Sequence, residues 1–314
     1  MGESEINGVT RREFLALTAS AIAAGTAATN AGNPVVTTGD AHGASSRTSL
    51  RKALKYGMIG VGETVREKFE AARDAGFEGI ELDSPGGPAT DEVLRAKEAT
   101  GIEVPGVVDS VHWRDSLSDA DASVRARGRT ALEQAIRDCA AWGGTSVLLV
   151  PAVVRKNVSY SQAYVRSQIE IRGVLPLARE LGVRISIENV WNNFLLSPIE
   201  AARYVDELGA DVVGWHFDVG NIVNYGWPEH WIRTLGHRIS RLDIKEFSRA
   251  KRDAEGLWKG FNVELGEGDC DWPAVMAAIT EIGYQGWACA EVAGGDAQRL
   301  AFLSKRMDEI LARP

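Results

Sequence analysis

Short apolar runs alternate with helical patterns through most of this chain, and this alternation limits its fold more than any other feature. Apolar runs of four to eight residues predict buried strands, and amphipathic spacing between them predicts helices. The predicted strands are Tyr56–Ile59, Gly79–Leu82, Glu103–Val107, Ser146–Val150, Arg184–Glu188, Val212–Phe217, Ser240–Lys245 and Ala288–Glu291. The predicted helices include Glu67–Ala75, Ala131–Ala141, Ser167–Leu181, Pro198–Leu208 and Ala297–Ala312. Eight strand–helix units over about 260 residues predict an α/β fold, the (β/α)8 TIM barrel.

A doubly wound open sheet is the alternative fold for an alternating chain. Such a sheet normally carries a glycine-rich phosphate-binding turn directly after its first strand. The stretch Gly57-Met58-Ile59-Gly60-Val61-Gly62 is a poor match to that turn, and we interpret it as the first strand and its turn. The barrel is therefore the predicted fold.

The bulk composition excludes several classes of protein. A net charge of −8 and a pI near 5.3 disfavour nucleic acid or an anionic membrane surface as a partner. No apolar run reaches the roughly 18 residues that a membrane span requires, so no membrane anchor is expected. Cys139, Cys270 and Cys289 lack C-x-x-C spacing, so they predict buried apolar side chains rather than a disulfide framework or a structural zinc site.

The first fifty residues differ in composition from the rest. Arg11 and Arg12 precede Phe14-Leu15 and an alanine-rich apolar stretch, an order that resembles a twin-arginine export signal. We predict a signal peptide over residues 1–30, a flexible linker rich in Gly, Ala, Thr and Ser over residues 31–50, and the barrel over residues 51–314. Such a signal predicts a periplasmic or secreted protein.

Acidic residues stand at or near the ends of the last four predicted strands: Glu188, Asp218, Asp243 and Glu291. The carboxyl ends of barrel strands meet at one rim, where active sites lie, so these carboxylates are expected on one side of the mouth. Like charges that close repel unless a cation neutralises them or their pKa values rise. A single strand-end acid is often only a rim ion pair, but four on consecutive strands favour a site for one divalent metal ion. An all-oxygen ligand set favours Mn²⁺ or Mg²⁺, with Zn²⁺ or Co²⁺ as alternatives.

Other residues near these strand ends are candidates for binding a substrate. His112 follows the third predicted strand, His216 and Lys245 each share a strand face with a nearby acid, and Asn221 lies in the turn after the sixth strand. Tryptophans are candidates for stacking on a sugar ring, and these are Trp113, Trp191, Trp215, Trp227 and Trp258. Each of these residues also has a purely structural interpretation. His216 could be a hydrogen-bonded core residue, His112 a loop residue and Asn221 a turn residue. Lys245 could form a structural salt bridge, and the tryptophans could fill the core or an interface.

At these residues the chain resembles the sugar phosphate isomerase/epimerase family of xylose isomerase-like barrels. The resemblance covers residues 54–311, and its most specific stretches are Ile187-Glu188-Asn189-Val190-Trp191, Phe217-Asp218-Val219-Gly220-Asn221, Leu265-Gly266-Glu267-Gly268-Asp269 and Gly283-Tyr284-Gln285-Gly286-Trp287. In that family a Glu, an Asp, a His and a Glu on the fifth to eighth strands hold one divalent metal ion, and the two glutamates also move protons. The resemblance assigns these roles to Glu188, Asp218 and Glu291.

One departure from the family concerns the seventh strand. The usual pattern there is His-x-Lys-Asp, whereas this chain has Asp243-Ile244-Lys245-Glu246. A shorter carboxylate thus replaces the imidazole ligand. Asp243 could still bind a metal ion, with a preference shifted toward harder ions.

The resemblance implies an isomerase or epimerase that acts on a keto sugar through an enediolate, with Glu188 and Glu291 as acid and base. Two alternatives stay open: a metal-dependent lyase or dehydratase on a similar substrate, and a secreted carbohydrate-binding barrel without turnover. A basic segment, Arg249, Lys251, Arg252 and Lys259, could be a phosphate clamp or a solvated loop. Because sugar phosphates are scarce outside the cytoplasm, a neutral keto sugar or glycoside derivative is the preferred substrate. The expected partner is this small sugar, and the formation of a homo-oligomer stays open.

Overall fold

The computed structural model describes residues 50–209 and 211–312. The predicted export signal, residues 1–30, and the predicted linker, residues 31–50, lie outside this range apart from Leu50, and both stay predictions. Within the described residues, no helix combines the length and the apolar character that crossing a membrane requires.

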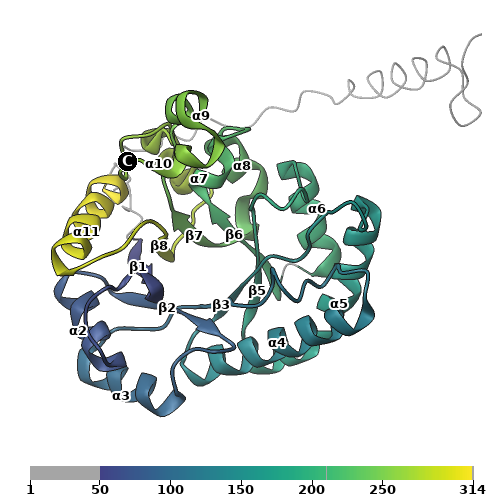
Figure 1. Cartoon of the computed structure of the whole chain (residues 1–314), viewed down its shortest axis with the longest axis horizontal. Helices are drawn as coiled ribbons and strands as arrows, with labels where there is room; N and C mark the ends of the chain where they lie inside the picture. The colour runs from purple at the N-terminus through teal and green to yellow at the C-terminus, as the bar shows by residue number, and fades with distance from the viewer. Residues whose placement is uncertain (1–49, 210, 313–314) are drawn as a thin grey trace, which may run out of the picture. The chain divides into compact units, whose positions relative to one another are not determined.

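Eight parallel strands close into one barrel, in which each strand pairs with its sequence neighbours and β8 pairs with β1 (Figure 1). The strands are β1 (Arg51–Lys55), β2 (Gly79–Ser84), β3 (Val107–Asp109), β4 (Ser146–Leu149), β5 (Arg184–Glu188), β6 (Val213–Asp218), β7 (Ile239–Ile244) and β8 (Trp287–Ala290). The closed order confirms the predicted TIM barrel, and the open-sheet alternative is wrong. Because all strands run parallel, their carboxyl ends gather at one rim.

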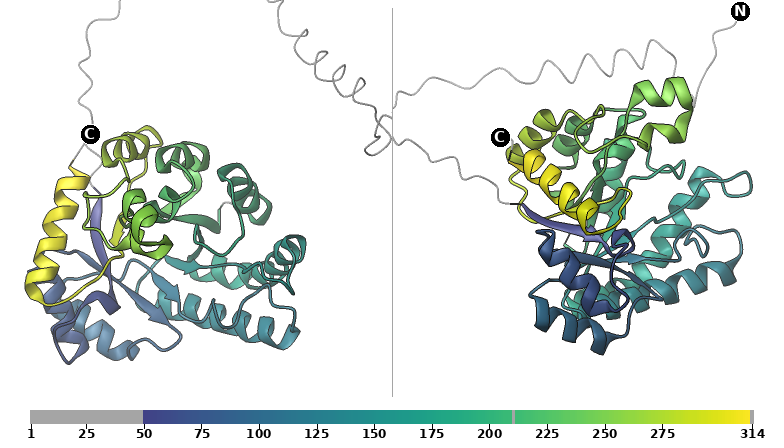
Figure 2. Two further views of the ribbon diagram at one scale, coloured as in Figure 1. Left: turned by 45° about the horizontal axis from the view of Figure 1, so that its top comes forward. Right: turned by 60° about the vertical axis from the view of Figure 1, so that its left-hand side comes forward.

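Helices surround this barrel on its outside (Figures 1 and 2). The α-helices are α2 (Val65–Asp74), α3 (Thr90–Thr100), α4 (Ala122–Ala141), α5 (Tyr160–Leu181), α6 (Pro198–Leu208), α7 (Val219–Val223), α8 (Pro228–Leu235), α9 (Arg249–Glu255), α10 (Trp272–Glu281) and α11 (Ala297–Leu311). Short 3-10 helices are η1 (Tyr56–Met58), η2 (Gly236–Arg238) and η3 (Leu257–Phe261). Local chemistry fixes their ends: α5 begins with a capping box between Ser159 and Gln162, and it ends at Gly182, whose φ of 65° is left-handed.

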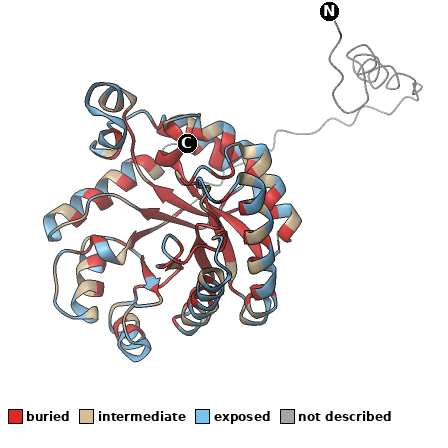
Figure 3. Ribbon diagram, turned by 45° about the vertical axis from the view of Figure 1, so that its right-hand side comes forward, coloured by how far each residue is buried: buried red, intermediate tan, exposed pale blue. Residues whose placement is uncertain are grey.

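The main hydrophobic core lies between the strands and the helices, and Figure 3 shows buried strands inside helices that are exposed on their outer faces. The barrel interior holds charged side chains instead. Glu81, Arg241 and Asp243 are buried there, and the side chain of Lys55 is 14% exposed. The three cysteines are free and buried, as predicted.

Two of the predicted strands are misplaced. The first strand is Arg51–Lys55 and not Tyr56–Ile59, and the segment interpreted as that strand and its turn begins with the 3-10 helix η1. The third strand is Val107–Asp109 and not Glu103–Val107. Pro105 has no N–H to donate to a strand ladder, and Glu103 forms only an isolated bridge to Gly79.

The register of the last strands brings the acidic residues into one layer. Asp218 on β6 is paired with Asp243 on β7, and Asp243 is paired in turn with Cys289 on β8. Glu188 on β5 is paired with His216, two residues before Asp218. The acids at the ends of these strands therefore lie side by side at the carboxyl-end rim.

Candidate active site

The structure brings the four predicted acids together. Ligand oxygens of Glu188, Asp218, Asp243 and Glu291 all lie within 4.8 Å of one another. The first three side chains are buried, whereas the side chain of Glu291 is 33% exposed. Solvent therefore reaches the cluster on the Glu291 side. We call these four residues the acidic cluster.

Asp218 is held by contacts on both sides of its strand end. Asn189 accepts the Asp218 backbone N–H at 3.0 Å and donates its side-chain amide to the Asp218 carbonyl at 2.7 Å. The Asp218 carboxylate caps α7, because its Oδ1 accepts the backbone N–H of Asn221 at 2.9 Å. The carboxylate therefore has a fixed direction before any ligand arrives.

Lys245 joins two members of the acidic cluster. Its Nζ lies 2.9 Å from Asp218 Oδ2 and 3.0 Å from Glu291 Oε1. Burial would lower the pKa of Lys245, but the surrounding carboxylates raise it, so the ammonium stays charged. From the sequence, Lys245 could form a salt bridge or contact a substrate. The structure shows salt bridges to Asp218 and Glu291.

The pKa of Glu291 is shifted in the opposite direction from the pKa values of the other three acids in the cluster. Burial, followed by repulsion from Glu291 and Asp218, raises the pKa of Glu188 well above its usual value. Burial also raises the pKa of Asp218 and, far more, that of Asp243. For Glu291, burial is outweighed by Lys245 and Lys55, so its pKa is lowered. Without a further cation, negative charge in the cluster is therefore unfavourable, above all at Glu188 and Asp243.

Asp243 faces the barrel interior as well as the acidic cluster. Lys55 Nζ lies 3.0 Å and His216 Nε2 lies 2.9 Å from Asp243 Oδ1. Neither approach has the alignment of a hydrogen bond, and among the described residues both Asp243 oxygens lack a hydrogen-bond partner. Burial and the nearby Lys55 lower the pKa of His216 to about 3, so this imidazole is neutral.

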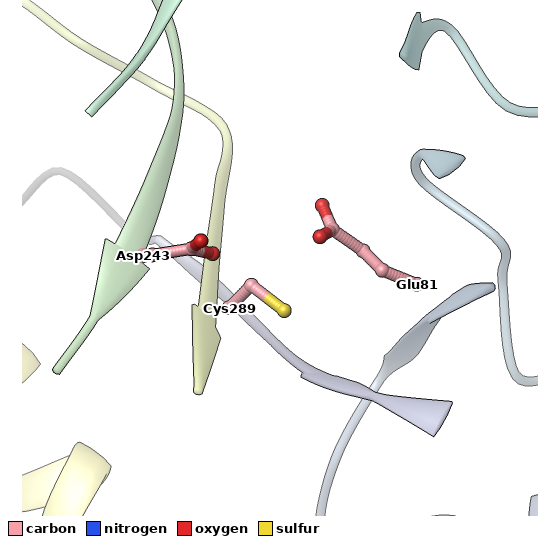
Figure 4. A group of neighbouring side chains, drawn as sticks. All are labelled: Glu81, Asp243 and Cys289. Carbon is pink, nitrogen blue, oxygen red and sulfur yellow. The ribbon is translucent and has the colours of Figure 1, made fainter. Parts of the chain in front are cut away.

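A second group of potential ligands shares Asp243. Glu81 on β2 and Cys289 on β8 each offer an atom within 4.8 Å of Asp243 and of each other, and Figure 4 shows the Glu81 side chain extending toward the other two. This second group already contacts an ammonium, because Lys55 Nζ donates to Glu81 Oε2 at 2.6 Å. Burial would raise the pKa of Glu81, but Lys55, together with Arg241, lowers it to about 2.

The remaining predicted substrate residues lie around the acidic cluster. The Asn221 amide donates to Glu188 Oε1 at 3.4 Å and to the Asn189 carbonyl at 3.0 Å. Trp191 donates from Nε1 to the Asn221 carbonyl at 2.8 Å. His112 is buried, and its Nδ1 accepts the Val150 N–H at 3.3 Å. Burial lowers the pKa of His112 to about 4.

Aromatic side chains form a wall beside the acidic cluster. Trp191 packs against Trp258 and Phe261 with ring centroids 4.9 and 5.0 Å apart, and Phe261 lies 5.3 Å from Lys245 Nζ. Trp258 is 67% exposed at the outer end of this wall. Trp215 does not belong to it, since its ring is fully buried and donates to Asn189 Oδ1.

The basic segment after β7 mostly holds backbone carbonyls. Arg249 donates to the carbonyls of Val223 and Gly226, and Arg252 donates to that of Asn224. Lys251 donates to the Asn262 carbonyl. These side chains fasten α9 to the α7–α8 connection and to the end of η3, which leaves them little freedom to bind a phosphate.

Several structurally important residues were not predicted from the sequence. Lys55, Glu81 and Asn189 gave no signal as single residues, because their partners come from distant strands. Glu246 appeared in the sequence analysis only as part of the seventh-strand pattern, and its buried carboxylate accepts N–H groups of Gly266, Cys270 and Trp272. It fixes the loop before α10 and does not join the acidic cluster.

Comparison with known proteins gives concordant results. A family model described as a xylose isomerase-like TIM barrel matches residues 69–307. The L-ribulose-5-phosphate 3-epimerase UlaE of Salmonella paratyphi C (strain RKS4594) is 24% identical over 290 residues, which cover 84% of this chain and 96% of that protein.

Solved structures of low sequence identity share the fold. A D-allulose 3-epimerase from Methylomonas sp. has a TM-score of 0.69 at 18% identity and covers 84% of this chain and 97% of its own. The 3-keto-D-glucoside 4-epimerase YcjR from E. coli has a TM-score of 0.71 at 15% identity and covers 84% of this chain and 100% of its own. The family match spans more than half of the sequence, so this chain belongs to the xylose isomerase-like TIM barrel family.

Proposed function

We propose that this protein is a divalent-metal-dependent isomerase or epimerase of a neutral keto sugar. The observation that carries the proposal is the acidic cluster, in which four carboxylates from four consecutive strand ends lie within 4.8 Å of one another. The named relatives, which are sugar epimerases, support the reaction class.

The residues of the acidic cluster fit a divalent ion. Each of the four offers one carboxylate oxygen, and both oxygens of the buried Asp243 carboxylate lack a hydrogen-bond partner among the described residues, a deficit that a cation would relieve. Oxygen ligands favour Mn²⁺ or Mg²⁺, with Zn²⁺ or Co²⁺ as alternatives. When bound, such an ion polarises a substrate carbonyl and stabilises the charge that develops on its oxygen.

We assign proton transfer to Glu188 and Glu291. They come from β5 and from the end of β8, so they stand at the two ends of the acidic arc, with the two aspartates between them. A glutamate is one methylene longer than an aspartate, so one of its oxygens can face the ion while the other reaches a sugar carbon. If one glutamate removes a proton next to the carbonyl and the other returns a proton to the opposite face, the carbon is epimerised. Return to the neighbouring carbon gives aldose–ketose isomerisation.

Neighbouring residues hold these two glutamates in place. Asn221 donates to Glu188, and Lys245 contacts Glu291. We assign Asn221, Lys245, His112 and Trp191 to the walls that bind the sugar. His216 has a different role, because its Nε2 faces Asp243 and it acts on the site through that carboxylate.

The contacts of the basic segment favour a neutral substrate. Three of its four basic side chains donate to backbone carbonyls. Within the described part of the chain, Lys259 is the one member of this segment whose side chain has no hydrogen bond or ion pair. A single exposed lysine is a weak phosphate site compared with a clamp of several donors. The aromatic wall, by contrast, suits the apolar face of a sugar ring.

A substrate screen tests the proposal. Purified protein is incubated with D-tagatose, D-allulose, a 3-keto-D-glucoside and L-ribulose 5-phosphate, with Mn²⁺ and after treatment with EDTA, and the products are identified by NMR. We expect an epimer or isomer of a neutral keto sugar that forms only with the metal ion. Elimination products would support a lyase instead, and sugar binding without turnover would support a carbohydrate-binding barrel. A preference for the phosphorylated sugar that is lost in Lys259→Ala would overturn the assignment of a neutral substrate.

A further inference from the structure

Lys55 is a cation whose side chain points into the barrel and contacts one member of the acidic cluster, Asp243. It is the last residue of β1, and its side chain is 14% exposed. Its Nζ lies 2.6 Å from Glu81 Oε2 and 3.0 Å from Asp243 Oδ1, and those two side chains are 2% and 0% exposed. The ammonium thus lies between carboxylates from two other strands, as a bound metal ion would.

Together, two lysines contact most of the acidic cluster. Lys245 is within 3.0 Å of Asp218 and Glu291, and Lys55 is at 3.0 Å from Asp243. Of the four carboxylates, Glu188 alone has no ammonium within this distance among the described residues, and it receives only the Asn221 amide. The two cations differ in their partners, because Lys245 contacts Asp218 and Glu291 whereas Lys55 contacts Glu81 and Asp243.

A buried carboxylate that loses its partner is strongly destabilised, so the metal-free protein depends on these ammonium groups. A divalent ion in the acidic cluster would supply positive charge to the same Asp243 carboxylate. Lys55 and the ion would then repel each other and compete for one partner. A group that stabilises the metal-free state and opposes the ion must weaken metal binding.

We infer that Lys55 is a placeholder cation, which holds Asp243 and keeps the barrel interior folded until a divalent ion binds. The inference rests on the metal site of the proposed function. It explains how Asp243 can stand at a position where the family has a neutral histidine: the extra negative charge on β7 is offset by a positive charge on β1. Glu81, on the neighbouring strand β2, accepts a hydrogen bond from the same ammonium at 2.6 Å, and its side chain extends toward Asp243 (Figure 4).

The test compares Lys55→Met with Lys52→Met. Lys52 lies on the same strand, but its ammonium contacts Asp308 on α11 at 2.6 Å, outside the barrel. Thermal unfolding of the full chain is followed after EDTA treatment and with saturating MnCl₂, and Mn²⁺ affinity is measured from the EPR signal of the free ion. The difference between the two unfolding midpoints reports the stabilisation by the metal ion.

We expect Lys55→Met to lower the midpoint of the metal-free protein more than that of the Mn²⁺-loaded protein, and to tighten Mn²⁺ binding by about tenfold, within the range of ordinary couplings between sites. Lys52→Met should leave the difference and the affinity unchanged. Equal losses in both states with unchanged affinity would show that Lys55 is only structural, and weaker Mn²⁺ binding would also overturn the inference.

The same readouts decide three further outcomes. If Lys55→Met does not fold, Lys55→Met/Glu81→Gln removes one charge of each sign and takes its place. If the parent binds no Mn²⁺ but the Lys55 variant does, the inference holds and the metal dependence of the proposed function fails. If neither protein binds Mn²⁺, both fail.

Discussion

Glu246 allows a quantitative prediction, because three of its four hydrogen-bond donors come from one segment, residues 266–272. The carboxylate is 1% exposed. Its Oε2 accepts the Gly266 N–H and the Trp272 indole N–H, both at 2.7 Å, and its Oε1 accepts the N–H groups of Cys270 at 3.2 Å and Phe247 at 3.3 Å. In Glu246→Gln one oxygen becomes an NH₂ group that faces two donors, so two hydrogen bonds are lost.

Hydrogen bonds to a charged acceptor contribute about 1.5–3 kcal/mol each, so the loss of two predicts about 3–6 kcal/mol of destabilisation. At about 2–4 °C per kcal/mol for a domain of this size, the unfolding midpoint should fall by roughly 6–24 °C. Differential scanning calorimetry measures this shift, and hydrogen exchange should show faster exchange in residues 264–272. The matched control is Glu267→Gln, since Glu267 lies in the same loop with a side chain that is 58% exposed. A Glu246→Gln midpoint within about 1 °C of the parent would refute the reasoning.

Three further predictions concern stability, metal binding and export. Burial raises the pKa of Asp109 to about 7 from its ordinary 3.8, so folding takes up a proton between these values. Asp109 should therefore contribute a loss of stability of about 4 kcal/mol as pH rises from 4 to 7, and Asp109→Asn should have a smaller difference between thermal melts at pH 5 and pH 8 than the parent. Asp243→Asn should weaken Mn²⁺ binding, so that excess Mn²⁺ partly restores turnover; full turnover without added metal would contradict its role as a ligand. Arg11→Lys/Arg12→Lys should block export, and periplasmic levels equal to the parent's in cell fractionation would exclude the twin-arginine signal.

The strands that carry the acids were predictable because their inward acids follow continuous apolar runs. The predicted Arg184–Glu188 is identical to β5, and the predicted helix Pro198–Leu208 is identical to α6. The arrangement of the acids also follows from topology, since the ends of consecutive parallel strands must be neighbours. The direction of each carboxylate does not follow from it, because Asn189 and Lys245 set those directions through contacts across strands.

The first strand shows why part of the fold was not predictable. Three of the five residues in Arg51–Lys55 are Arg or Lys, which normally indicates an exposed segment. Lys55 can be buried because Glu81 and Asp243 form ion pairs with its ammonium, and both lie far away in sequence.

The errors in the third strand and in two helix starts have other causes. For the third strand a signal against the prediction was present, since Pro105 lies within the predicted run. The helices α4 and α5 begin nine and seven residues earlier than predicted, at N-caps Asp121 and Ser159 that bind the first turn.

The most direct test of the central claim follows a single proton. The parent, Glu188→Gln, Glu291→Gln and the loop control Glu267→Gln are incubated with Mn²⁺ and the best keto sugar of the screen in buffered D₂O, and deuterium at the carbon next to the carbonyl is measured by NMR. The parent and Glu267→Gln should exchange at the same rate. Glu188→Gln and Glu291→Gln should each be slower by about 10²–10⁴, the contribution of a positioned acid or base, while a Mn²⁺ titration shows that metal is still bound. If both variants exchange this proton at the parental rate, the two-glutamate mechanism is wrong.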